Sequence, residues 1–163
     1  VFLERVEGYG VEIMKGHNFD KRDTMWLFSH SGINNVNIDV ALEAKKQGMK
    51  VIAFGSAAEA KGKQTRHSSS KNIFEIADLV VDTCAPAGDA SVPLKNHQDK
   101  IGPVSTMAFV TCVWMTVTTV AEILAERGVK LHIHPSHNVP GDTTAKQRLE
   151  EALAEYKKRV AGV

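Results

Sequence analysis

Short runs of apolar residues alternate with stretches of helical periodicity along the first half of this chain. The runs cover residues 24–28, 51–54 and 79–81. Between the first two runs, Val36, Val40 and Ala44 recur at a spacing of four residues, which predicts a helix. Continuous apolar strands separated by helices are typical of a parallel sheet covered on both faces. The alternation therefore predicts the α/β class, with a doubly wound parallel sheet.

The other elements follow from apolar spacing and from glycine and proline. A helix is expected over residues 1–15, a long one over residues 103–127, and a last one beginning at Thr143 or Thr144. Ser70 is expected to cap a short helix, and residues 131–133 to form a fourth strand. Residues 57–70 and 85–100 are expected to be loops.

Composition narrows the class of protein. The chain has 163 residues, the size of one domain, and its net charge is +1. So small a charge gives no electrostatic case for a nucleic-acid or membrane-surface partner. Its cysteines, Cys84 and Cys112, form no disulfide framework, so we expect buried reduced thiols and a cytoplasmic location.

Residues 101–121 carry no charge, and the stretch is long enough to cross a bilayer. It is rich in serine and threonine, however, which fits poorly with a hydrocarbon environment. A helix buried in the domain core or in a subunit interface is therefore favoured over a membrane span. We expect a homodimer or homotetramer that buries part of residues 106–119.

The most informative segment joins the first expected strand to the helix that follows it. It reads Ser29-His30-Ser31-Gly32-Ile33-Asn34-Asn35. Gly32 lets the main chain approach a ligand, and free N–H groups at a helix start favour an anion. The spacing is neither that of a P-loop nor that of the Rossmann glycine motif. A phosphate site and a plain helix start with incidental serines remain equal alternatives from the residues alone.

Several other residues are candidates for chemistry, each beside a plainer interpretation. His97 is a candidate proton shuttle in a loop, Glu122 a candidate general base on the long helix, and Asp82 a candidate at a strand end. For all three, a solvated or interface side chain is the more common role. The basic residues around 61–71 are interpreted as a solvated loop rather than as a steering patch.

A histidine cluster near the C-terminus has a spacing that suits metal ions. His132, His134 and His137 would suit zinc or nickel if residues 131–133 formed a strand. A polar strand end before Pro135 is the favoured alternative, so no metal and no cofactor are expected.

Residues 23–32 and 41–53, with residues 77–81 and 102–109 further along, resemble the SIS (sugar isomerase) domain family. The family carries a strand, Ser-x-Ser-Gly-x-Thr, a helix ending in Ala-Lys-x-x-Gly, and a strand, and the resemblance covers about residues 20–127. Residues 29–32 with 86–90 are most similar to an uncharacterised bacterial branch of these proteins.

The resemblance implies a flavodoxin-like, three-layer α/β/α fold that binds a phosphorylated sugar. Matched to the family motif residue by residue, Ser29 and Ser31 would bind the phosphate, helped by the main chain of His30 and Gly32. Asn34 stands where the family has threonine. Ser105, at the start of the long helix, would face the sugar together with Thr106.

The resemblance also implies a reaction, the metal-free aldose–ketose isomerisation of a phosphorylated sugar or amino sugar. A non-catalytic module that senses a sugar phosphate is the alternative. The family has an earlier strand and a glycine-serine loop, which residues 1–18 do not supply. Residues 1–163 are therefore expected to be a single SIS-type domain lacking its N-terminal portion, and a poor catalyst alone.

Overall fold

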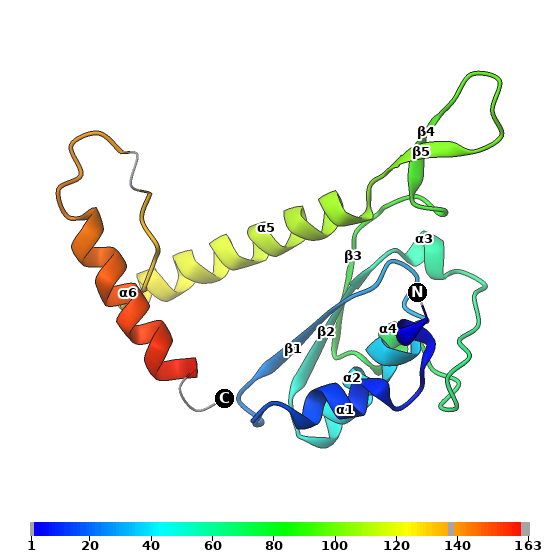
Figure 1. Ribbon diagram of the computed structural model, residues 1–163, viewed down its shortest axis with the longest axis horizontal. Coiled ribbons are helices and arrows are strands. Elements are labelled where there is room, and N and C mark those ends of the chain that lie inside the picture. The colour runs from blue at the N-terminus through cyan, green and yellow to red at the C-terminus, as the bar shows by residue number, and fades with distance from the viewer. Residues whose placement is uncertain (1, 137–138, 161–163) are drawn as a thin grey trace. The chain divides into compact units, whose positions relative to one another are not determined.

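The computed structural model describes residues 2–136 and 139–160 as an α/β protein with a parallel sheet (Figure 1). The predicted fold class is confirmed. The elements are η1 (Leu3–Arg5), α1 (Tyr9–Lys15), β1 (Thr24–Phe28), α2 (Asn35–Lys46), β2 (Lys50–Gly55), α3 (Ala57–Ala60), α4 (Ile73–Ile76), β3 (Leu79–Asp82), β4 (Ala90–Pro93), β5 (Lys100–Pro103), α5 (Ser105–Glu126) and α6 (Ala145–Val160).

The main sheet has the strand order β1-β2-β3, and both pairings are parallel. Phe28 lies opposite Phe54, and Gly55 lies opposite Asp82, so the carboxyl ends of the strands meet at one edge. In the part of the chain that the structure describes, β1 is an outer strand of this sheet. Loops that follow parallel strands at such an edge are the usual ligand sites of α/β folds.

One face of the sheet is covered by α2 and α4, and α1 lies against α2 (Figure 1). From α2, Ile38, Ala41 and Ala44 are fully buried, as are Val51 and Ala53 on β2. Burying a large aliphatic side chain contributes about 1.5–3 kcal/mol. This core therefore fixes the strand ends and the start of α2 relative to one another.

The other face is aromatic. The rings of Phe28 and Phe54 stack with centroids 4.7 Å apart, and Phe109 of α5 meets Phe28 edge-on at 5.6 Å. Apart from this contact, α5 has little of its surface covered, and among its described residues Ser105 alone is buried. The expectation that this helix is buried in the chain's own core is wrong, because three strands offer α5 too little apolar surface.

By length and composition alone, α5 is also the one described helix that could cross a membrane, a property that core helices share.

The chain divides into two compact units, Val1–Trp114 and Met115–Val163, and α5 contributes to both. Among the described residues, the second unit contains the end of α5, a connecting segment and α6. Residues 131–133 do not form the expected strand, because the described residues of this unit include no strand with which they could pair. The prediction of a single SIS-type domain over residues 1–163 remains a prediction.

Four local expectations are corrected. Residues 90–93 and 100–103 form a hairpin in the expected loop, with Val92 paired to Ile101, and α3 occupies part of the other expected loop. Asn72, not Ser70, caps α4, through a capping box with Glu75. Ser70 has a φ of +57°, which is incompatible with the extended backbone of a cap residue. Cys84 is exposed rather than buried, since it lies in the loop after β3.

Candidate functional site

Main-chain pairing continues past the strand ends and draws three loops together. The Ser29 N–H donates to the Phe54 carbonyl oxygen at 3.0 Å, and the Ser56 N–H donates to the His30 carbonyl oxygen at 3.0 Å. The Thr83 N–H donates to the Gly55 carbonyl oxygen at 2.8 Å. The segments after β1, β2 and β3 therefore lie side by side at the carboxyl edge of the sheet.

The turn at residues 29–32 is fixed by its own contacts. The buried Ser29 hydroxyl oxygen accepts the Gly32 N–H at 3.0 Å. Gly32 has a φ of +72°, and a Cβ placed there would lie 2.5 Å from the ring of Phe74. Only glycine fits this position without displacing Phe74. The hydroxyl of Ser29 thus has a structural role in closing the turn.

Ser31 differs from Ser29. Its side chain is half-buried, and in the described part of the chain its hydroxyl takes part in no hydrogen bond. Two serines that the sequence treated as equivalent therefore have different roles, one inside the turn and one open to a ligand.

The start of α2 has no side-chain cap. Asn34 occupies the cap position, but its side chain makes no capping hydrogen bond and instead donates to Glu4 Oε2 at 3.2 Å. Asn35 donates to the Arg5 carbonyl oxygen at 2.9 Å. The first-turn N–H groups of α2 are therefore left without a side-chain cap, at the end of the helix where its dipole is positive.

A pocket of about 220 Å³ adjoins this helix start. Two exposed cations, Arg5 and Arg66, line it together with Ile33, Asn34, Asn35 and Gln64. Neither arginine forms an ion pair with any residue that the structure describes. The pocket thus joins positive charge to open main-chain N–H groups, a combination that suits an anion.

Asp89 organises the start of α5. Its carboxylate accepts the Val104 N–H at 2.9 Å, the Ser105 N–H at 2.7 Å and the Ser105 hydroxyl at 2.8 Å. Burial raises the pKa of Asp89, but the hydrogen bonds from Ser105 and Val104 outweigh burial and lower it below the ordinary value. Ser105 is buried with its hydroxyl proton committed to Asp89, whereas Thr106 is exposed.

His30 brings these regions together. Its Nε2 lies 3.9 Å from Glu59 Oε2, and the ring interacts electrostatically with both Glu59 and Asp89. Glu59 also pairs with Lys63 and accepts the Gly88 N–H at 2.7 Å; Lys63 first, then Gly88, lowers the pKa of Glu59. From the sequence only a main-chain role was expected for His30, because no spacing along the chain places Glu59 and Asp89 beside its ring.

The structure places the two predicted catalytic residues elsewhere. His97 lies between β4 and β5 with a mostly exposed ring, and its Nδ1 accepts the Asp99 N–H at 3.0 Å. Glu122 is exposed on α5 within the second unit. Asp82 accepts the Ala57 and Cys84 N–H groups and so stabilises the loops.

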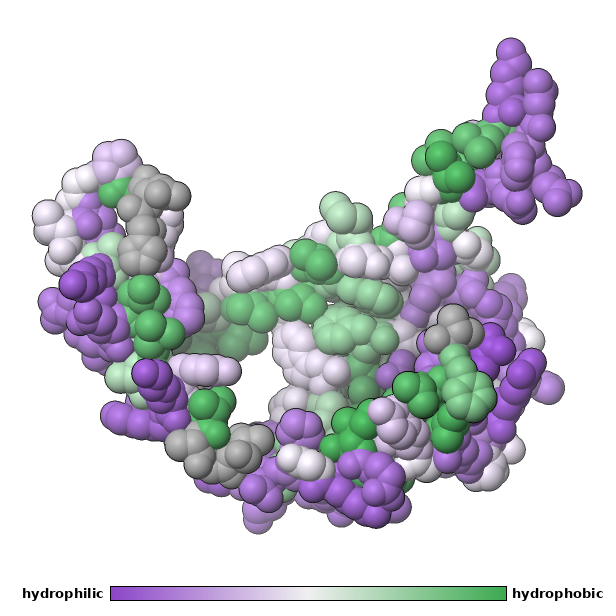
Figure 2. Space-filling view, in the orientation of Figure 1, coloured by the Kyte–Doolittle hydropathy of each residue, from purple (hydrophilic) through white to green (hydrophobic). Residues whose placement is uncertain are grey.

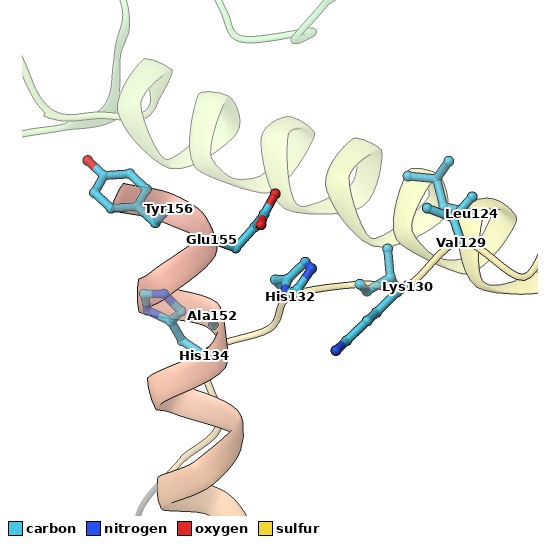
Figure 3. A pocket seen from close by; sticks show the side chains of 9 residues that line it. Leu124, Val129, Lys130, His132, His134, Ala152, Glu155 and Tyr156 are labelled. Atoms are coloured by element: carbon cyan, nitrogen blue, oxygen red, sulfur yellow. The ribbon is translucent and has the colours of Figure 1, made fainter. Parts of the chain in front are cut away.

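The histidine cluster is not completed within the described residues. His132 and His134 line a pocket of the second unit with Glu155 and Tyr156, as Figure 3 shows. His137 lies outside the described residues. Within residues 2–136 and 139–160, no three His, Cys, Asp or Glu side chains form a group that could hold a metal ion.

Comparison with known proteins supports the family resemblance. Residues 1–56 match the model of the SIS domain. The chain is 35% identical to the UPF0309 protein ABC0887 of Shouchella clausii, covering 91% of this chain and 61% of that protein. It is 36% identical to the UPF0309 protein OB3413 of Oceanobacillus iheyensis, with the same coverage, and 31% identical to the UPF0309 protein BH3325 of Halalkalibacterium halodurans, covering 86% of this chain and 58% of that protein.

The recognition made from the sequence is therefore confirmed, since residues 1–56 match the SIS domain. The chain's relatives are the bacterial UPF0309 proteins, and it spans about three fifths of the length of those it matches. An SIS domain implies the binding of a carbohydrate derivative.

Proposed function

We propose that this chain binds the phosphate group of a phosphorylated sugar at residues 29–35. The observation that carries the proposal is the open start of α2, where uncapped N–H groups lie beside the unengaged hydroxyl of Ser31. The turn below it is held rigidly by Ser29, Gly32 and Phe74, so the donors need little reorganisation when the ligand binds.

Phosphate recognition would divide between direct contacts and long-range attraction. The α2 N–H groups and the Ser31 hydroxyl would donate to phosphate oxygens, each such bond contributing roughly 1.5–3 kcal/mol. Arg5 and Arg66 would raise the local concentration of the anion. Ser105 and Thr106 would lie on the sugar side, with the Ser105 oxygen free only to accept.

For the whole protein we propose aldose–ketose isomerisation of a phosphorylated sugar or amino sugar, with no cofactor. The alternative is a non-catalytic sensing module, and the exposure of His97 in its hairpin favours that alternative. A cytoplasmic location, assembly as a homodimer or homotetramer, and the absence of nucleic-acid and membrane partners also remain proposals.

The test is calorimetry on the 163-residue chain with glucose 6-phosphate, fructose 6-phosphate and the parent sugars. Ser31→Ala should weaken sugar-phosphate binding about tenfold or more, since 1.4 kcal/mol is one decade. Ser91→Ala, in the hairpin, serves as the matched control and should leave affinity intact. Equal binding of phosphorylated and parent sugars, or unchanged affinity in Ser31→Ala, would show that the serines only shape the helix start.

A further inference from the structure

The imidazole of His30 is anomalous for a buried polar group. Within the described residues, both of its ring nitrogens are buried and neither has a hydrogen-bond partner. Leaving a buried donor or acceptor unsatisfied costs about 1–3 kcal/mol, so such groups are uncommon in folded proteins. The ring lies at the carboxyl edge of the parallel sheet, where α/β folds usually bind ligands. Its two unsatisfied nitrogens therefore indicate that a bound ligand provides their hydrogen-bond partners.

The position of the ring follows from its two acidic neighbours. Its Nε2 lies 3.9 Å from Glu59 Oε2, and the ring interacts electrostatically with Asp89. Asp89 holds the start of α5 through the Val104 and Ser105 N–H groups. The ring of His30 therefore lies near the start of α5.

The charged groups that face the ring are occupied elsewhere. Glu59 pairs with Lys63 and accepts the Gly88 N–H, and its nearer oxygen stays 3.9 Å from His30 Nε2. Asp89 accepts three hydrogen bonds, from the Val104 and Ser105 N–H groups and from the Ser105 hydroxyl. The two carboxylates thus frame the imidazole without hydrogen-bonding to it, and they hold the loops on either side of it in place.

We propose that His30 recognises the hydroxyl-bearing part of the ligand whose phosphate binds at residues 29–35, an assignment that rests on the proposed function above. A neutral imidazole donates from one nitrogen and accepts at the other. Sugar hydroxyls donate and accept as well, so the ring matches a polyol better than it matches a phosphate, which only accepts when fully ionised.

Access requires a small movement. The His30 side chain is 16% exposed, and its nitrogens are covered in this structure. Rotation about the side-chain torsions would turn a nitrogen of the ring, in place of a carbon, toward the ligand. The main chain need not move, because the Ser56 N–H donates to the His30 carbonyl oxygen and holds it in place. The contact would also place on a sugar hydroxyl an imidazole, the side chain that enzymes use most often for proton transfer.

The experiment separates the sugar from the phosphate. Dissociation constants are measured by calorimetry for glucose 6-phosphate, fructose 6-phosphate and inorganic phosphate, with the wild-type chain and with His30→Phe. The variant should weaken the binding of at least one sugar phosphate about tenfold, the loss of roughly one hydrogen bond, while inorganic phosphate binds as before. His30→Gln should recover part of the loss, because its amide also donates and accepts. His17→Phe, a change at an exposed histidine that follows α1, should alter the binding of none of the three ligands.

The outcomes distinguish the two proposals. If Ser31→Ala weakens all three ligands and His30→Phe weakens none, the phosphate site stands and the assignment of His30 is wrong. If the wild-type chain binds none of them, both proposals are wrong.

A second measurement controls for folding. His30→Phe should melt no lower than the wild-type chain, since it removes buried unsatisfied nitrogens. In the wild type, the imidazole nitrogen resonances of His30 should shift with glucose 6-phosphate or fructose 6-phosphate, but not with inorganic phosphate. A large drop in melting temperature together with unshifted resonances would show that the ring is structural.

Discussion

The two compact units use their apolar residues in opposite ways. In Val1–Trp114, α2, α4 and the three parallel strands bury a continuous core around Ile38, Val51 and Ile73. In the described part of Met115–Val163, the buried residues are two alanines of α6, Ala145 and Ala152. The same chain thus has a unit with a packed interior and a unit whose large apolar side chains lie on the surface, as the apolar patches in Figure 2 illustrate.

This difference decides where a precise site can form. The loop 29–35 is set on strand ends and on a helix that the core immobilises, and Gly32 touches Phe74 on the edge of that core. The pocket lined by His132, His134 and Tyr156 has larger volume, about 360 Å³, but no comparable buried support. Rigid support, more than pocket size, favours the first unit as the ligand site.

The largest expected effect tests the contrast directly. Phe54→Ala should cost about 3–5 kcal/mol of unfolding free energy, because Phe54 is fully buried against Trp26 and Phe28. Leu153→Ala, on α6 with 39% of the leucine exposed, should cost less than about 1 kcal/mol. Denaturant unfolding measures both losses, and equal losses would contradict the difference in packing between the two units.

A polar network within the first unit gives the next effect. Asp39 is buried and accepts the Gly8 N–H at 2.7 Å and the Gly10 N–H at 3.2 Å, and its Oδ1 lies 3.0 Å from His67 Nε2. Asp39→Ala leaves these groups unsatisfied and should cost about 2–4 kcal/mol. Glu150→Ala, which removes an exposed pair on α6, is the control and should change stability very little. Thermal and denaturant unfolding measure the stability of both variants. If the two are equally stable, Asp39 is not needed to join α1, α2 and the loop at His67.

The sequence predicted well those elements that local rules determine. The apolar runs located β1, β2 and β3, and periodicity located α2 and α5 within about two residues, since burial on both sides of a strand leaves a continuous apolar pattern. The hairpin of β4 and β5 was missed because its turn chemistry, with Asp89 and Asn96 at positive φ, was concealed among prolines and polar residues.

The candidate site was predictable in place but not in detail. The strand–serine–glycine–helix order located residues 29–35. Ser29 differs from Ser31 because its hydroxyl oxygen accepts the Gly32 N–H. The start of α2 has no side-chain cap because the Asn34 side chain donates to Glu4 instead. Glu59 and Asp89 meet His30 only through the fold, which no spacing along the chain encodes.

Self-association of the chain tests whether the exposed surface of α5 is an interface. Met107, Val110, Trp114 and Val117 recur at spacings of three and four, which places them along one side of the helix, and each is at least 41% exposed. We expect a homodimer or homotetramer that covers this side. Val110→Glu should weaken assembly at least tenfold by light scattering, whereas Val160→Glu, a similarly exposed valine of α6, should not. A wild-type chain that is monomeric at tens of micromolar, a rough concentration for a moderate interface, contradicts the proposal.

The smallest effect concerns an ion pair that ties α2 to the sheet. Asp78 lies 2.8 Å from Lys45 Nζ and 3.3 Å from Lys50 Nζ, and it accepts the Val51 N–H at 2.9 Å. Lys45 above all, then the Val51 N–H, holds the pKa of Asp78 well below its usual range. A carboxyl whose pKa is lower in the folded state stabilises the fold above its unfolded pKa of about 3.9, and the contribution is lost as the pH falls through the folded value.

Asp78→Asn should therefore cost on the order of 1 kcal/mol at pH 7, a modest value because solvent screens the exposed pair. The difference between wild type and variant should shrink as the pH falls below about 4, because the Asp78 carboxyl of the unfolded chain begins to protonate there while the folded carboxyl stays ionised. Glu151→Gln, which removes an exposed pair with Lys130 in the second unit, should shift stability less at every pH. Urea unfolding from pH 2 to pH 8 gives both curves. No difference at any pH in that range would mean that Asp78 acts through the Val51 hydrogen bond alone, which an asparagine oxygen also accepts. The apolar face of α2 would then hold the helix to the sheet without help from the ion pair.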